Sequence, residues 1–169
     1  MIIGNGSIAK LLNDREGFLF FAAGVSDSAM GNYDYFQNPE RQREHKLFFE
    51  HAKTANQNKM MFVYFSTISK FIKFTDYTLH KNTMEFCIRD FCENYTIIRL
   101  GNVWECTNPN TFINAYKVKP YEPRDEYKYM ISKEQLNFIT DNLPRTGKHE
   151  ISIFGELLTV KECLKRATK

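Results

Sequence analysis

The sequence predicts an α/β fold, a doubly wound parallel sheet with a small α+β remnant at its C-terminal end. First, apolar runs alternate along the chain with segments of helical periodicity, an order typical of parallel sheets. Second, these runs are continuously apolar rather than alternating, as in strands that are covered on both faces. Third, a length of 169 residues suits one domain with its own hydrophobic core.

The N-terminal part predicts a strand, a turn, a short helix and a second strand. A short apolar run at residues 1–3 leads directly into a glycine cluster. Ile8, Leu11 and Leu12 then follow at the spacing i, i+3, i+4, which places them on one face of a helix. Residues 18–23 form a continuous apolar run that ends at a glycine, so we expect a buried strand there.

The middle of the chain predicts two long helices and two further strands. We expect helices at residues 40–58 and 77–93, and strands at residues 59–65 and 95–100. In the first helix the expected buried residues are Leu47, Phe48, Phe49 and Ala52, and the residues expected to face water are Arg41, Arg43, Glu44, Lys46, Glu50 and Lys53. In the second helix the expected inward residues are Met84, Ile88, Phe91 and Cys92.

The C-terminal part is less regular. We expect a loop at residues 119–125, a helix at 132–139 with a capping-type start, a half-exposed strand at 149–154 and a short helix that begins at Thr159. We therefore divide the chain into a sheet core, residues 1–103, and a reduced C-terminal segment, residues 104–169, packed on it as one compact domain.

Composition excludes several classes of protein. A formal net charge of +3 is too small to indicate a nucleic-acid partner, and no stretch approaches the roughly 20 apolar residues of a membrane span. The N-terminus lacks the pattern of a secretion signal. The four cysteines, Cys87, Cys92, Cys106 and Cys163, form no Cys-x-x-Cys pair, so we expect no metal site and reduced thiols in a cytoplasmic protein.

The glycine cluster after the first apolar run has the spacing of a phosphate-binding turn. It comprises Gly4, Asn5, Gly6, Ser7 and Ile8, with the small residue Ala9 in the third position of a Gly-x-Gly-x-x-Ala pattern. In such a turn the glycines allow a sharp bend and a close approach of backbone N–H groups to a diphosphate. Taken alone, the pattern fits an ordinary tight turn equally well.

A second group of residues could move a proton. Tyr77 and Lys81 are spaced i, i+4 and share a helix face, and Thr67 lies at the carboxyl end of a buried strand. An ammonium beside a phenol favours the phenolate, and a hydroxyl could hold the same substrate oxygen. Taken alone, the pair also fits a helix-start aromatic and a solvated lysine.

The order of these motifs is more informative than any one of them. It runs through residues 4–9, 20–24, 63–67, 77–81 and 95–103, followed by a tail at residues 147–153 and 158–162. This series resembles the extended short-chain dehydrogenase/reductase family, specifically its NAD-dependent nucleotide-sugar epimerases and dehydratases. The resemblance implies a minimal Rossmann-like fold and a strongly truncated member of that family.

The resemblance also implies a role for individual residues. Tyr77 would be the catalytic acid/base, Lys81 would tune it and hold the nicotinamide ribose, and Thr67 would orient the substrate oxygen. The implied cofactor is NAD or NADP, held by Gly4, Asn5, Gly6, Ser7, Ile8, Ala22, Ala23, Gly24, Ser66 and Lys81. Asn102 would contact the phosphates of a nucleotide-sugar substrate, and helices 40–58 and 77–93 would pair two copies into a homodimer.

The sequence departs from the family at the adenosine end of the cofactor site. The acidic residue expected about 20 positions after the glycines is missing, because Asp14 and Glu16 come too early and Asp27 follows another strand. Two alternatives therefore stay open beside the epimerase-like enzyme. One is a non-catalytic binding or assembly protein, and the other is a reductase of small carbonyl compounds.

Overall fold

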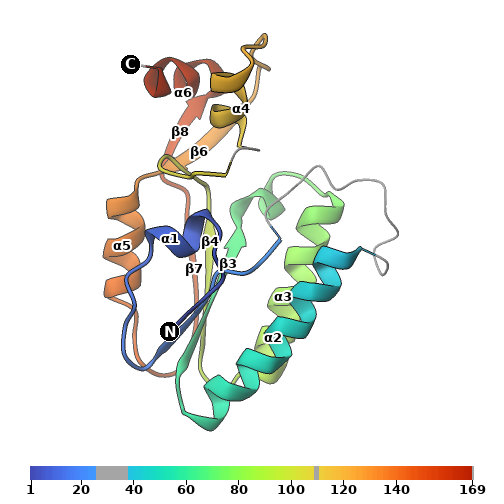
Figure 1. The fold of residues 1–169 in the computed structure, drawn as a ribbon, viewed down its shortest axis with the longest axis vertical. Helices are drawn as coiled ribbons and strands as arrows, with labels where there is room; N and C mark the ends of the chain where they lie inside the picture. Colours follow the sequence, from blue (N-terminus) through green and yellow to red (C-terminus); the bar gives the residue numbers. More distant parts are fainter. Residues whose placement is uncertain (26–37, 109–110, 169) are drawn as a thin grey trace.

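The computed structural model describes residues 1–25, 38–108 and 111–168. A five-stranded parallel sheet lies between two layers of helices, with a smaller lobe at one end (Figure 1). In spatial order its strands are β1 (Ile2–Ile3), β2 (Phe18–Phe21), β3 (Met61–Thr67), β4 (Tyr95–Leu100) and β7 (Lys148–Ile153). The predicted α/β fold with a parallel sheet is confirmed.

Two helices cover each face of this sheet. α1 (Ser7–Leu11) and α5 (Lys133–Asp141) pack on one face, and α2 (Pro39–Gln57) and α3 (Asp76–Phe91) pack on the other (Figure 1). Each face has its own apolar core, and successive residues of β2, β3 and β4 alternate between the two. Strands buried in this way on both sides explain the continuously apolar runs in the sequence.

The connections after β1 and β2 leave the sheet in opposite directions. The chain turns from β1 into α1 on one face and continues after β2 to α2 on the other. Parallel strands with diverging connections leave a crevice at their carboxyl ends, which is where open α/β sheets bind ligands. The fold therefore places a crevice beside the glycine turn.

A small lobe built on a second sheet stands over those carboxyl ends. It contains β5 (Asn102–Val103), β6 (Tyr127–Ile131), β8 (Glu156–Thr159), α4 (Phe112–Val118) and α6 (Val160–Ala167). Its core is a separate apolar cluster formed by Ile113, Met130, Leu158, Val160, Cys163 and Leu164. The chain passes between the lobes three times, because it enters the small lobe after β4, returns to the large sheet for α5 and β7, and enters the small lobe again at β8.

The predicted strands and helices agree with the structure to within two residues at each end, whereas β5, β6, β8 and α4 were not predicted. We expected a strand over residues 59–65, but the strand begins at Met61 and continues to Thr67. Lys59 has a φ of 53°, a left-handed conformation that extended strands do not adopt. A 3₁₀ helix, η2 (Ile68–Phe71), follows the strand directly.

The buried faces of α2 and α3 differ from the prediction at four residues. Phe49 and Phe91 are 47% and 42% exposed rather than buried. Their rings contact each other at the outer surface, with centroids 5.5 Å apart. Arg41 and Glu44 were expected to face water, yet they are 4% and 0% exposed. The buried face of α2 is therefore more polar than its composition suggested.

Candidate functional site

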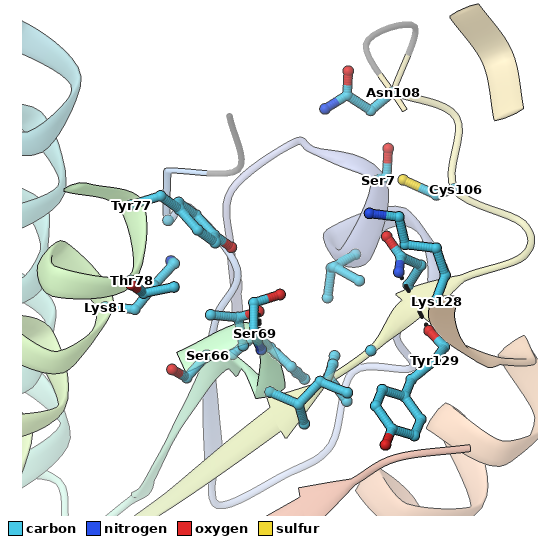
Figure 2. Close-up of a pocket in the computed structure, with 18 of the residues that line it drawn as sticks. Ser7, Ser66, Ser69, Tyr77, Thr78, Lys81, Cys106, Asn108, Lys128 and Tyr129 are labelled. Carbon is cyan, nitrogen blue, oxygen red and sulfur yellow. Dashed lines mark hydrogen bonds between the residues drawn. The ribbon is translucent and has the colours of Figure 1, made fainter. Parts of the chain in front are cut away.

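The candidate site is a cleft between the carboxyl ends of the large sheet and the small lobe. It has a volume of about 1120 Å³. Tyr77 and Lys81 on α3 form one wall, and Ser7 and Cys106 lie opposite, with Lys128 and Tyr129 of the small lobe beside them (Figure 2). A cleft of this size lies just above the usual range for small-molecule sites.

Most of the predicted site residues line this one cleft. They are Gly6, Ser7, Ile8, Ala22, Gly24, Ser66, Thr67, Tyr77, Lys81 and Asn102. These residues come from the ends of β2 and β3, from the start of α1 and the turn before it, from α3 and from β5, so the tertiary structure brings them together in one cleft. Gly4, Asn5 and Ala23 belong to the same turns but are not among the lining residues.

Gly4 has a structural task in the first turn. Its φ is +118°, and a Cβ atom there would lie 2.6 Å from the carbonyl oxygen of Ala22. Only glycine combines that conformation with so close an approach of two backbone segments. The first glycine thus lets β1 turn beside the end of β2, while Gly6 lines the cleft.

Tyr77 and Lys81 occupy the first turns of α3. A capping box between Thr75 and Thr78 fixes the start of this helix. The Tyr77 hydroxyl points into the cleft (Figure 2), and the Lys81 ammonium lies 5.9 Å from the centre of its ring. The i, i+4 spacing therefore produces the predicted neighbours, a phenol and an ammonium facing one space.

Lys81 also forms hydrogen bonds with Tyr64 and Glu44, which the sequence did not predict. Its Nζ donates to Tyr64 Oη at 3.0 Å and to Glu44 Oε1 at 3.4 Å. Tyr64 Oη in turn donates to Glu44 Oε1 at 2.8 Å. The helical pattern of the sequence predicts a solvated position for Glu44, whereas the structure buries it. Phe48 and Ala52, four and eight positions after Glu44, are both buried. Residues at this spacing share one face of a helix, so the pattern could have indicated that Glu44 faces inward.

His80 belongs to the same buried cluster. Its Nε2 lies 2.9 Å from Glu44 Oε2. Burial disfavours the Glu44 carboxylate, but the Lys81 ammonium and the hydrogen bond from His80 outweigh it and hold the pKa of Glu44 well below its usual range. Burial and the Glu44 charge raise the pKa of Tyr64, which therefore stays a neutral donor.

Ser66 and Thr67 differ in their side-chain partners. Ser66 Oγ donates to Glu85 Oε1 at 2.7 Å, on the face covered by α3. Thr67 Oγ1 accepts a hydrogen bond from the Ser69 N–H at 3.1 Å, which starts η2. Adjacent strand residues project to opposite faces, so these two predicted residues cannot share a side-chain role. Both remain among the residues that line the cleft.

A network of ion pairs continues behind Ser66. Arg99 contacts both Glu85 and Glu150, Arg89 bridges the same two carboxylates, and Lys70 adds a further contact to Glu85. Burial opposes ionisation of Glu85, but hydrogen bonds from Arg99, Lys70 and Ser66 lower its pKa to about 2. Hydrogen bonds from Arg89 and Arg99 likewise lower the pKa of Glu150 to about 2.

The residues present fit the nicotinamide end of a dinucleotide better than its adenosine end. Lys81 has three N–H donors, and its contacts to Tyr64 and Glu44 leave one for a ligand in the cleft. Nothing lies within 4 Å of the position that a Cβ atom of Gly6 would take, so backbone approach there is open. The cleft carboxylates that the structure describes are Asp125 and Glu126 of the small lobe; Asp27 lies outside the described residues.

Asn102 reaches the cleft from β5, and its side-chain amide donates a hydrogen bond to the backbone oxygen of Tyr129 at 3.3 Å.

Within the described ranges no group of three or more His, Cys, Asp or Glu side chains could hold a metal ion. None of the described helices is both long enough and apolar enough for a membrane span. All four cysteines are unpaired, with Cys92 and Cys163 buried.

Known structures share this fold. No family profile matches the sequence, and no curated protein matches it with significant similarity. The Bordetella bronchiseptica enzyme WbmG, solved with NAD and UDP, has a TM-score of 0.63 at 17% identity and covers 89% of this chain. The Helicobacter pylori ADP-L-glycero-D-manno-heptose-6-epimerase has 0.60 at 14% identity and covers 90%. The Thermus thermophilus UDP-glucose 4-epimerase, solved with NAD, has 0.59 at 12% identity and also covers 90%.

The matched part is a little over half of each of those proteins, namely 55%, 57% and 61% of their chains. Identities this low establish the arrangement of strands and helices. The chain therefore has the fold of the extended short-chain dehydrogenases/reductases, in agreement with the resemblance of its ordered motifs.

Proposed function

We propose that the protein catalyses NAD- or NADP-dependent oxidoreduction of a nucleotide-sugar, a reaction of the epimerase or dehydratase type. One observation carries the proposal. The glycine turn, Thr67, and the Tyr77–Lys81 pair line a single cleft at the carboxyl ends of parallel strands, where this type of fold binds its ligands. The proteins of similar fold that were solved with NAD, or with NAD and UDP, support the same class of ligand.

In this proposal Tyr77 is the acid/base. Its hydroxyl faces the cleft (Figure 2), so it can take the proton of a substrate hydroxyl while Thr67 holds the same oxygen. The Lys81 ammonium lies 5.9 Å from the ring centre and would stabilise the negative charge that develops during this proton transfer. The nicotinamide would supply the hydride acceptor and donor when bound, and Lys81, Gly6, Ala22 and Gly24 would hold it.

The charge of the cleft supports a substrate with a diphosphate. Lys10, Lys73 and Lys128 line the cleft together with Asn102, and Lys128 is paired with Glu126 at 2.9 Å. Cations and an amide donor recognise phosphate oxygens. We therefore place the sugar near Tyr77 and its nucleotide diphosphate toward the small lobe.

We test this proposal by calorimetric titration with NAD, NADP and their reduced forms, followed by turnover assays with a panel of nucleotide-sugars. Tyr77→Phe should retain cofactor binding and lose about 10²–10⁴-fold in kcat, because it removes a general acid/base. Lys81→Ala should weaken both binding and turnover. Lys81→Ala also leaves Glu44 buried without its ammonium, so its thermal stability must be measured beside its activity.

The absence of binding by every one of these nucleotides at millimolar concentration would contradict the proposal. It would then favour the non-catalytic assembly protein, which the lack of a carboxylate for the adenosine ribose among the described cleft residues also favours. Turnover of simple aldehydes or ketones, with none of nucleotide-sugars, would instead identify a reductase of small carbonyl compounds.

A further inference from the structure

We propose that Glu44 is a positioning residue for Lys81. Its buried carboxylate supplies the counter-charge that fixes the Lys81 ammonium in the wall of the cleft beside Tyr77. The position of Lys81 is a property of the folded chain, and only its consequence for Tyr77 rests on the proposed function.

The first argument is geometric. Glu44 reaches Lys81 both directly, at 3.4 Å, and through Tyr64, which bonds to Lys81 at 3.0 Å and to Glu44 at 2.8 Å. The three groups come from α2, β3 and α3, so they close a triangle across three elements. The second carboxylate oxygen of Glu44 is held by His80 and by the Val25 N–H. The carboxylate itself is therefore fixed from several sides.

The second argument is burial. The Glu44 and His80 side chains are fully buried, and the Lys81 side chain is 3% exposed. A buried ammonium without a counter-charge is strongly disfavoured. Since Lys81 is enclosed in the wall of the cleft, the Glu44 carboxylate supplies the opposite charge that holds its ammonium in place.

The third argument is the space at Gly24. A Cβ atom on Gly24 would lie 2.7 Å from Lys81 Nζ and 2.9 Å from Glu44 Oε1. The loop after β2 thus approaches the ion pair so closely that a side chain there would displace it. Gly24 leaves room for the pair and also lines the cleft.

Other titratable groups surround the pair on each packed element. Tyr64 lies on β3, Tyr77 and His80 on α3, and His45 on α2, its ring 5.6 Å from that of His80; Glu85 of α3 adds a more distant negative charge at Tyr64. Lys81 is the cation in direct contact with Glu44 and within 6 Å of the Tyr77 ring. Removal of Glu44 should therefore act on Tyr77 through Lys81.

The experiment observes the Lys81 ammonium directly and needs no cofactor. The protein is labelled with ¹⁵N-lysine, and the ammonium cross-peak that Lys81→Arg removes is assigned to Lys81. We expect a resolved signal, because a buried, hydrogen-bonded ammonium exchanges its hydrogens slowly with water. In Glu44→Gln the exchange should be at least about tenfold faster, the equivalent of one charged hydrogen bond.

Glu85→Gln is the matched control, because Glu85 is equally buried on the same face of the sheet but bonds to Ser66, Lys70, Arg89 and Arg99. It should leave the Lys81 signal unchanged. Glu44→Asp, which keeps the charge, should restore part of the slow exchange.

A folded Glu44→Gln protein with an unaltered Lys81 signal would overturn the inference, as would the lack of a protected signal in the unsubstituted protein. If the Glu44→Gln protein does not fold, the Tyr64→Phe variant tests the inference instead. It removes one acceptor of the triangle and should speed exchange severalfold, and unchanged exchange would overturn the inference. A protected signal in a protein that binds no nucleotide would refute the proposed function and leave the role of Glu44 intact.

Discussion

At Gly4 and Gly6, two glycines of one turn have different physical roles. Gly4 is fixed by its φ of +118° and by the Ala22 carbonyl oxygen, 2.6 Å from where a Cβ would lie. Gly6 has a φ of −72° and open space around its Cβ position. In the sequence motif the first glycine allows the sharp bend and the second lets the backbone approach a diphosphate. The structure assigns the backbone constraint to the first and the lining of the cleft to the second.

This difference predicts unequal costs of substitution. Gly4→Ala should lower the free energy of unfolding by at least about 2 kcal/mol, because it adds backbone strain and a steric clash. Gly6→Ala should cost less than about 1 kcal/mol, the range for an unfavourable residue at a helix N-cap. Urea unfolding of both variants checks the prediction, and equal losses would contradict it.

At the scale of elements, α2 and α3 expose several large apolar side chains to solvent. Phe49, Leu79, Phe86 and Phe91 are 47%, 37%, 68% and 42% exposed. The resemblance implied that these two helices pair across a two-fold axis. We propose that a second copy covers them, because exposed aromatic residues gathered on neighbouring helices are typical of interfaces.

Phe86→Glu should convert such a dimer into a monomer, because two copies of a buried charge would face each other across the axis. Phe138→Glu is the control, since Phe138 is 71% exposed but lies on α5, at the opposite face of the sheet. Sedimentation equilibrium measures both variants. A monomeric unsubstituted protein at high concentration would exclude the dimer.

At the scale of the whole molecule, the Glu85–Arg99–Glu150 network connects α3, β4 and β7. It ties the last strand of the sheet to the helix that carries Tyr77. Both carboxyl groups have a pKa of about 2 in the folded protein, against an ordinary value of 4.5 for glutamate. Their contribution to stability is therefore complete above pH 4.5 and is lost as the pH falls towards 2.

We expect the free energy of unfolding to fall by about 3 kcal/mol over this range from Glu85 alone, since a shift of one pKa unit corresponds to about 1.4 kcal/mol. Glu150 is one-third exposed and should contribute less. Glu85→Gln should flatten the pH dependence below pH 4.5, whereas Glu50→Gln, at an exposed position of α2, should not. Urea unfolding across this pH range measures all three proteins, and the same slope in Glu85→Gln as in the unsubstituted protein would contradict the assignment.

Most of the large sheet and much of the cleft could be predicted from the sequence. Apolar runs specify β2, β3 and β4 because strands buried on both faces need no polar alternation. The short strands β5, β6 and β8 and the helix α4 were missed, because elements of two to seven residues carry too little periodicity to stand out.

The sequence by itself determined the order of the large-sheet strands and of the long helices along the chain, and the neighbourhood of Tyr77 and Lys81, because both are set by local spacing. Only the tertiary structure decided which charges are buried and paired. Glu44 and Lys81 are separated by 37 positions. The sequence around either residue therefore gives no indication of the other. Their pairing follows from the packing of α2 and α3 on one face of the sheet, where each is the other's nearest compensating charge.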